Sequence, residues 1–350
     1  MARLTSFHPV PSTRVVSYSV LLALGFSMAA CPAEPDPDAP HLAPVTEGLP
    51  EGLLSVWGTA NDDVWLAGSD VGSGAALWHW SGSDWASFDA GAGGLWWGHS
   101  FDDGRVLVGG EGGRILRRDG EGAEFVEQST PGSNTVYGIW GASSDDVWAV
   151  GGIEGVSGFA WHWDGSAWND VALPTEVQSE SMFKVWGRGA DDLWVVGSGG
   201  VILHWDGSAF ELESSAVERT LFTVHASATQ VVAVGGFASG VILERSEDGT
   251  WVDVTPELAG QINGVRVDDA GGGWAVGVNG ESYRRVGQGV WEADPESPFV
   301  FGGLHSVWMG PGATAASAST WAVGGQLSST PPTEGVVLHA GPAAPASLTP

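Results

Sequence analysis

Short apolar segments recur along this chain. Within each segment two sets of side chains alternate with a period of two, and the segment ends at a glycine. The clearest example is Asp-Val-Trp-Ala-Val-Gly at residues 146–151, in which Val147 and Ala149 alternate with Trp148 and Val150. A period of two is typical of a pleated β-strand, and the helical period never develops across these segments. The pattern therefore predicts an all-β protein.

The alternating segment returns seven times along the chain. Its closing glycine falls at Gly68, Gly109, Gly151, Gly197, Gly235, Gly277 and Gly324. The successive intervals are 41, 42, 46, 38, 42 and 47 residues, which suits a unit of four short strands. A second column upstream holds Trp57, Trp97, Trp140, Trp186, His225, Arg266 and Trp308. We therefore expect a seven-bladed β-propeller of four-stranded antiparallel blades over residues 41–341.

The third and fourth strands of each unit are marked by turns and by an aromatic column. Asp-Gly pairs such as Asp206-Gly207 tolerate the positive φ angles of a two-residue hairpin. The strand after the hairpin carries Trp85, Phe125, Trp168, Phe210, Trp251 and Trp291. The seventh member is missing, because the chain ends in the Pro-rich residues 342–350, which we expect to be a disordered tail. The spacing predicts that residues 41–46 at the N-terminus close the ring as the outer strand of the last blade.

The run Trp-Val-Val-Gly-Ser-Gly-Gly-Val-Ile-Leu-His-Trp-Asp-Gly at residues 194–207 resembles the BNR/Asp-box class of propeller repeat, especially propellers similar to the photosystem II assembly factor. The resemblance extends over residues 41–341 and implies the propeller fold. The nearest approach to an Asp box, Ser246 to Trp251, is two positions shorter than the family pattern. A family activity therefore does not transfer with the fold.

The first residues have a different character from the repeats. Arg3 and Arg14 precede an apolar stretch at residues 15–28, so residues 1–30 have the regions of a secretory signal peptide. Met28-Ala29-Ala30-Cys31 resembles a bacterial lipobox, which implies acylation of Cys31, the only cysteine in the chain. Signal-peptidase cleavage that leaves a free thiol is the alternative. Residues 31–40 are rich in proline and aspartate and predict an extended tether. We expect an exported protein, anchored by lipid in the cell envelope and most consistent with the outer membrane, on its periplasmic or surface side.

The charge of the chain limits the classes of partner that the protein is expected to bind. The formal net charge is −29, and residues 1–30 contribute no acidic side chain to it. Nucleic acids and anionic lipids are bound through Lys and Arg, so this composition excludes both as expected partners. It favours an envelope protein with a basic surface or a neutral glycan, and a closed ring is expected to be a monomer.

The repeat places the candidate catalytic and metal-binding side chains in different blades, so they do not gather at one point. The Asp pairs at residues 62–63, 102–103, 145–146 and 191–192 occupy one hairpin position in successive blades. The third-strand histidines stand one to a blade, at His79, His162, His204 and His339. Zinc requires several converging ligands, so we expect no metal and no cofactor. A sialidase-like glycosidase is the catalytic alternative, but Tyr137, Tyr283, Arg284 and Arg285 do not by themselves define an acid, a base and a nucleophile.

The sequence thus predicts a noncatalytic propeller that binds or scaffolds a protein partner through one face, with a glycan-binding propeller as the alternative. Three loops between second and third strands are longer than the others, and loop insertions on a regular scaffold are where binding usually resides. Asp70, Glu154 and Glu334 lie on these loops and are the candidate contacts to a basic partner. Neutral insertion is the alternative interpretation of these loops.

Overall fold

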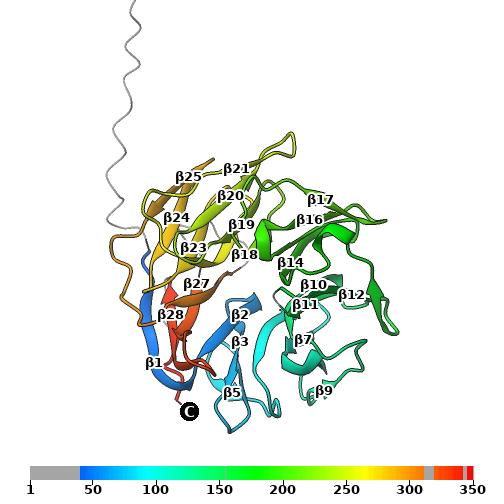
Figure 1. Cartoon of the computed structure of the whole chain (residues 1–350). Coiled ribbons are helices and arrows are strands. Elements are labelled where there is room, and N and C mark those ends of the chain that lie inside the picture. The colour runs from blue at the N-terminus through cyan, green and yellow to red at the C-terminus, as the bar shows by residue number, and fades with distance from the viewer. Residues whose placement is uncertain (1–39, 154, 311–318, 342–344, 350) are drawn as a thin grey trace, which may run out of the picture. The chain divides into compact units, whose positions relative to one another are not determined.

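A computed structural model describes residues 40–153, 155–310, 319–341 and 345–349 of the 350-residue chain. Residues 40–350 form one compact unit, and the following description concerns that unit alone. Seven sheets are arranged as a ring around a central channel (Figure 1). Each sheet contains four antiparallel strands, which confirms the predicted seven-bladed β-propeller.

The first three blades follow one another in chain order. Blade 1 contains β2 (Leu53–Ala60), β3 (Asp63–Asp70), β4 (Ala75–Trp80) and β5 (Trp85–Ser87). Blade 2 contains β6 (Leu95–Ser100), β7 (Arg105–Gly110), β8 (Ile115–Asp119) and β9 (Val126–Glu127), with the 3-10 turn η1 (Glu111–Gly113) between β7 and β8. Blade 3 contains β10 (Val136–Ser143), β11 (Asp146–Ile153), β12 (Ser157–Trp163) and β13 (Trp168–Val171).

The next three blades repeat the arrangement. Blade 4 follows the 3-10 turn η2 (Thr175–Val177) and contains β14 (Met182–Gly189), β15 (Asp192–Gly197), η3 (Ser198–Gly200), β16 (Ile202–Trp205) and β17 (Phe210–Glu213). Blade 5 contains β18 (Leu221–Ala226), β19 (Val231–Gly235), β20 (Val241–Arg245) and β21 (Trp251–Asp253). Blade 6 contains β22 (Ile262–Val267), β23 (Gly273–Gly277), β24 (Ser282–Gly287) and β25 (Val290–Ala293). The first strand of each blade lines the channel.

Blade 7 is assembled from both ends of the propeller. It contains β26 (Leu304–Met309), β27 (Thr320–Gln326) and β28 (Thr333–Ala340), and β1 (Ala43–Glu51) is its outer strand. Strand β1 pairs antiparallel with β28 from Ala43 opposite His339 to Glu51 opposite Thr333. The predicted closure by the N-terminal segment is therefore confirmed, and the strand extends to Glu51, beyond the expected residue 46.

Adjacent blades interlock through the Trp-Gly pair of the first strand. A Cβ atom added to Gly187 would lie 2.7 Å from the ring of Trp140 in the preceding blade, so only a glycine admits that ring. Gly58 receives Trp308 in the same way, whereas in blade 2 the Trp57 ring lies against Gly98, two residues before the equivalent position, which is Ser100. The repeated Val-Trp-Gly motif therefore records a packing contact between neighbouring sheets rather than a ligand site.

The register of blade 2 differs from the sequence prediction. Leu95 pairs with Gly110 as Val136 pairs with Gly151 in blade 3, which makes His99 rather than Trp97 the equivalent of the other first-strand tryptophans. The His99 ring accordingly lies 6.4 Å from that of Trp140. The sequence prediction was wrong because Trp97 lies only two residues before His99 and is followed by a glycine. It was therefore mistaken for the member of the first-strand tryptophan column in this blade.

Five of the seven blades have a tryptophan on the second strand that is packed against the third strand. Trp65, Trp148, Trp194, Trp274 and Trp321 are at most 2% exposed. In four blades the indole faces a third-strand histidine, with ring centroids 4.2 Å apart for Trp65 and His79. In blade 6 the guanidinium of Arg284 takes this place above Trp274. Most of the tryptophans are thus core residues, as the columns predict.

Residues 345–349 lie against the first blade. The Trp85 indole donates a hydrogen bond to the carbonyl of Ala346 (2.8 Å), and the backbone N–H of Leu348 donates to Thr46 Oγ1 (2.8 Å). Leu348 is only 2% exposed. These five residues differ from the disordered tail that the sequence predicts, because one leucine is buried against β1 and its neighbours.

The predicted signal peptide, Cys31 and most of the tether lie outside the described residues. No helix within the described part of the chain is long and apolar enough to cross a membrane. The anchoring of the protein therefore rests on the sequence pattern of residues 1–40.

Candidate binding site

Two of the three loop residues predicted to contact a partner can be placed in the structure. Asp70, at the end of β3, accepts backbone hydrogen bonds from Gly72 (2.7 Å), Gly74 (3.0 Å) and Gly93 (2.9 Å). The bond from Gly93 and those from the other two glycines lower the pKa of the Asp70 carboxyl. Asp70 therefore organises its own loop and the neighbouring one. Glu334 lies exposed in β28 at a positive φ of 53°, and Glu154 lies outside the described residues.

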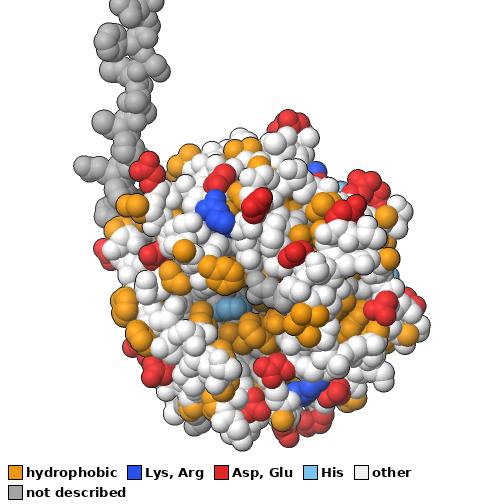
Figure 2. Space-filling view, in the orientation of Figure 1, with side chains coloured by type: hydrophobic (Ala, Val, Ile, Leu, Met, Phe, Trp, Pro, Cys, Tyr) orange, Lys and Arg blue, Asp and Glu red, His pale blue; other side chains and the backbone are white. Residues whose placement is uncertain are grey.

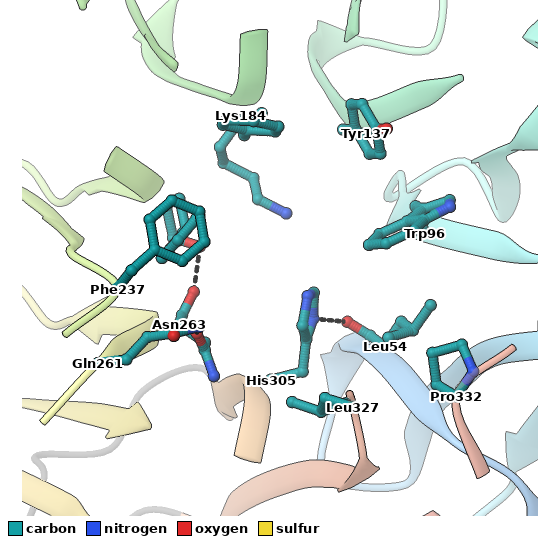
Figure 3. A pocket seen from close by; sticks show the side chains of 13 residues that line it. Leu54, Trp96, Tyr137, Lys184, Phe237, Gln261, Asn263, His305, Leu327 and Pro332 are labelled. Atoms are coloured by element: carbon teal, nitrogen blue, oxygen red, sulfur yellow. Dashed lines mark hydrogen bonds between the residues drawn. The ribbon is translucent and has the colours of Figure 1, made fainter. Parts of the chain in front are cut away.

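A pocket of about 330 Å³ opens at the mouth of the central channel (Figure 3). Its walls come from the first strands of all seven blades and from loops that join second to third strands. Those loops supply Phe237, Leu327 and Pro332. The pocket therefore opens on the face that carries the three predicted loops.

Each first strand places a residue in the pocket by means of a β-bulge. The pairing between the first and second strands shifts by one residue at the same point in every blade. In blade 3, for example, Val136 pairs with Gly151 and Gly138 pairs with Val150, so Tyr137 is the extra residue. A bulge redirects the side chain of the extra residue out of the normal alternation. The seven residues so placed are Leu54, Trp96, Tyr137, Phe183, Phe222, Asn263 and His305, and all of them line the pocket.

Aromatic rings from five of these positions and one loop form a continuous collar around the pocket. We define the collar by the six residues His305, Trp96, Tyr137, Phe183, Phe222 and Phe237. Neighbouring ring centroids are 5.0 to 6.1 Å apart, within the range of favourable aromatic contacts. Figure 2 shows hydrophobic side chains gathered around a histidine at the centre of this face, with acidic side chains scattered farther out.

Lys184 is the only lysine in the chain, and it lies in the wall of this pocket. Its side chain is 3% exposed, and its Nζ lies 3.0 Å from the centroid of the Trp97 ring. Burial lowers the pKa of the Lys184 ammonium well below its usual value. Figure 3 shows the amine directed into the open space that Trp96, Phe237 and His305 surround. Among the described residues, no ion pair includes Lys184.

The wall beside His305 is polar. His305 Nδ1 lies 2.5 Å from the carbonyl oxygen of Leu54, so this nitrogen carries the hydrogen and donates it. Burial, followed by the nearby Lys184, lowers the pKa of His305 to about 4, and the ring is therefore neutral at pH 7. Gln261 and Asn263 form the adjoining surface, where the Gln261 amide donates to Asn263 Oδ1 (2.8 Å).

Further cationic and imidazole groups face the channel from the first strands. The Arg266 guanidinium lies 4.6 Å from the Trp186 ring, and burial lowers the pKa of Arg266 to about 10. Burial also lowers the pKa of His225 well below its usual value and, with Arg266, that of His99 to about 4. The channel thus contains the amine of Lys184 and the guanidinium of Arg266 between neutral histidines.

The third-strand histidines do not converge on a metal. His79 pairs with Asp63 at 2.7 Å, and the equivalent pairs in blades 3 and 4 have the same geometry. His339 instead contacts Ser319 at 2.7 Å. Each histidine is occupied within its own blade, and no group of three or more His, Cys, Asp and Glu side chains suited to a metal is found among the described residues.

The residues considered for a sialidase-like site are separated. Tyr283 donates a hydrogen bond to Glu281 (2.8 Å), and burial together with Glu281 raises the pKa of its hydroxyl. Arg285 is buried in a bidentate pair with Glu244, whereas Arg284 lies above Trp274. Tyr137 belongs to the pocket collar. These groups do not face one substrate position.

The sequence did not reveal the pocket residues as a set. Alternation with a period of two assigns faces correctly along a regular strand, but a bulge moves one residue to the other face without any change in composition. The available signal was the position three residues before the first-strand Trp column, which is aromatic in Tyr137, Phe183 and Phe222.

No protein-family model matches the chain, and no curated protein matches it. Among solved structures, YCF48 from Cyanidioschyzon merolae is similar with a TM-score of 0.63 and 15% identity, covering 86% of this chain and 99% of that chain. A structure described as YCF48 bound to D1 peptide has a TM-score of 0.63 and 14% identity, covering 88% and 98%. The extracellular domain of a hybrid two-component system from B. thetaiotaomicron has a TM-score of 0.62 and 11% identity, covering 85% of this chain and 39% of that chain. These similarities show the propeller fold.

Proposed function

We propose that this chain is a noncatalytic binding propeller of the bacterial cell envelope, which engages a protein partner by taking a peptide segment into the channel pocket. The aromatic collar is the observation that carries the proposal. Its rings stay partly exposed at the mouth of a preformed cavity, whereas most side chains of the other aromatic columns are buried between or within the blades. The similar propeller described as bound to D1 peptide supports a peptide as the kind of ligand that this fold accepts.

The chemistry of the pocket supports binding rather than catalysis. His305 is held as a neutral donor to a backbone carbonyl. A glycosidase of the usual kind requires two carboxyl groups across the scissile bond. The described pocket wall contains no aspartate or glutamate.

The acidic surface outside the pocket supports a partner with a basic surface. Glu334 and Glu154 remain candidate contacts to it, whereas the carboxylate of Asp70 is already engaged by three backbone N–H groups. Capture that weakens with rising salt and with Glu334→Gln would support this part of the proposal.

Pull-down after crosslinking in the native envelope tests the pocket directly. Phe237→Asp places a charge at the rim without disturbing the core, because Phe237 is 58% exposed in a loop. The matched control is Val126→Asp, since Val126 is 60% exposed on the outer strand β9, away from the pocket. We expect loss of the captured partner with the first variant and full capture with the second. Equal capture by both would refute binding through the channel pocket.

A glycan is the second candidate ligand. Partly exposed aromatic rings next to the amides of Gln261 and Asn263 also suit a sugar ring, which stacks on aromatic faces and hydrogen-bonds to amides. A glycan array probed with the wild type and with Phe237→Asp distinguishes the two candidates. Binding of a defined glycan that the variant loses would favour the glycan over the peptide.

We also propose that acylation of Cys31 anchors the protein, with the membrane affinity coming from about 0.8 kcal/mol for each buried methylene. Cys31→Ser should move the protein to the soluble fraction and abolish labelling by a clickable palmitate. Labelling that persists in the variant would show that a residue other than Cys31 carries the lipid.

A further inference from the structure

Among the described residues, the buried amine of Lys184 has no ion-pair partner, although the chain is rich in acidic residues. The protein contains 42 aspartates and glutamates, and none of those that the structure describes lines the channel pocket. By comparison, the buried Arg285 forms a bidentate pair with Glu244 at 2.8 and 2.9 Å, whereas Arg266 in the channel lies over the Trp186 ring. An unpaired buried charge is costly, and natural structures normally provide it with a partner.

The ring of Trp97 supplies only part of the missing interaction. The amine lies over its face at 3.0 Å, which stabilises a cation but accepts no directional hydrogen bond. An ammonium group has three N–H donors, whereas the neutral His305, whose Nδ1 carries the hydrogen, offers a single acceptor at Nε2. The geometry therefore leaves room for an acceptor that comes from outside the chain.

The remaining walls define what accompanies that acceptor. Phe237 lies on one side of the pocket and Trp96 and Tyr137 on the other (Figure 3). Phe183 and Phe222 also line the pocket, so most of the surface around the amine is aromatic. A volume of about 330 Å³ is at the small end of the range for ligand sites, which is about 300–1,000 Å³. The pocket therefore suits one bulky group rather than a long segment.

We propose that the channel pocket recognises a carboxylate next to an aromatic or bulky apolar group, with the Lys184 ammonium bound to the carboxylate. The inference rests on the proposed peptide-binding function and specifies its chemistry. The carboxylate is supplied by the C-terminus of a peptide or by an acidic side chain within it. A charge-assisted hydrogen bond in a site of low polarity provides the selectivity for the anion.

The single lysine provides a direct test in the wild-type protein. Full-length protein labelled only at lysine with 13C at Cε gives one side-chain signal, which comes from Lys184. We expect N-acetyl-tryptophan to shift this signal and N-acetyl-tryptophanamide, which lacks only the carboxylate, to leave it in place. The acid should bind on the order of 10-fold more tightly than the amide, as expected for one hydrogen bond to a charged group.

Two variants separate the role of Lys184 from that of surface charge. Lys184→Met should abolish the preference for the acid while retaining the affinity for the amide, because the aromatic walls remain. Arg219→Met is the control, since the Arg219 guanidinium pairs with Asp253 at 3.1 Å and does not line the pocket. This variant should bind both compounds like the wild type. The labelling experiment needs no substitution and decides the question if Lys184→Met does not fold.

Three peptides identify the source of the carboxylate. Acetyl-Ala-Trp with a free C-terminus, its C-terminal amide, and acetyl-Glu-Trp-amide share a blocked N-terminus and differ in the presence and position of the carboxylate. Preferential binding of the first or the third supports the proposal and assigns the carboxylate to the chain end or to a side chain. Equal binding of all three with an unshifted lysine signal would overturn the carboxylate inference while leaving peptide binding intact. Failure of every peptide and of both tryptophan compounds would overturn both.

Discussion

Closure of the ring by β1 predicts a large loss of stability when Leu49 of this strand and Leu42, which directly precedes it, are shortened. Leu42 is 2% exposed and packs against residues of blades 6 and 7, whereas Leu49 is 3% exposed and packs against blade 1. Replacement of a buried leucine by alanine costs about 2–5 kcal/mol. The two side chains lie in separate clusters, so their effects should add, and the double variant should lose at least about 4 kcal/mol of unfolding free energy.

Guanidinium unfolding monitored by tryptophan fluorescence measures this loss. The control is Leu212→Ala, which makes the same change on the outer strand β17 at a position that is 49% exposed, and it should alter the unfolding free energy by no more than about 0.5 kcal/mol. Sedimentation velocity should also reveal association of the double variant through the exposed edge of β28. An unchanged unfolding midpoint with an unchanged slope would refute closure by β1.

Three further changes test the interior. Gly187→Ala should cost about 1–3 kcal/mol by forcing Trp140 aside, whereas Gly287→Ala, with no atom near its added Cβ, should be nearly neutral in chemical unfolding. Arg285→Ala should cost about 3–5 kcal/mol, because Glu244 would be left buried and unpaired. Burial alone would raise the pKa of Glu244, but hydrogen bonds from Arg285 and Trp291 lower it. Its stabilisation is therefore complete above the unfolded pKa of about 4.3 and is lost as the pH falls through the folded value, so the stability lost in Glu244→Gln should shrink between pH 7 and about pH 3.

The fold could be predicted because its determinants recur at a fixed interval. The glycine at the end of each second strand, for example Gly151, sits opposite the start of the first strand, where its missing side chain permits close approach of the backbone at Thr135. The first-strand glycines, such as Gly187, accept a tryptophan from the preceding blade. Each such contact is made once per blade by the same residue type, so the sequence repeats it visibly.

The site could not be predicted in the same way, because its residues do not repeat. Lys184 is the only lysine in the chain, but its place in the channel depends on the bulge between Met182 and Lys184 in β14. A one-residue slip of this kind reverses the face of a side chain and leaves no trace in the alternation of apolar and polar residues. Asp70 was selected because its loop is long, whereas its carboxylate is committed to three backbone groups of that region.

This contrast indicates where the specificity of such a chain resides. The position of the bulge is occupied successively by leucine, tryptophan, tyrosine, two phenylalanines, asparagine and histidine. Packing between blades does not constrain these side chains to one type, since they face the channel and not a neighbouring sheet. Each blade can therefore vary its own contribution at little cost in stability, and the seven contributions meet in one cavity. The outer surface and the pocket therefore have separate roles. The acidic outer surface determines the solubility and long-range charge of the protein, while the bulge residues and Lys184 in the channel determine which ligand chemistry is bound.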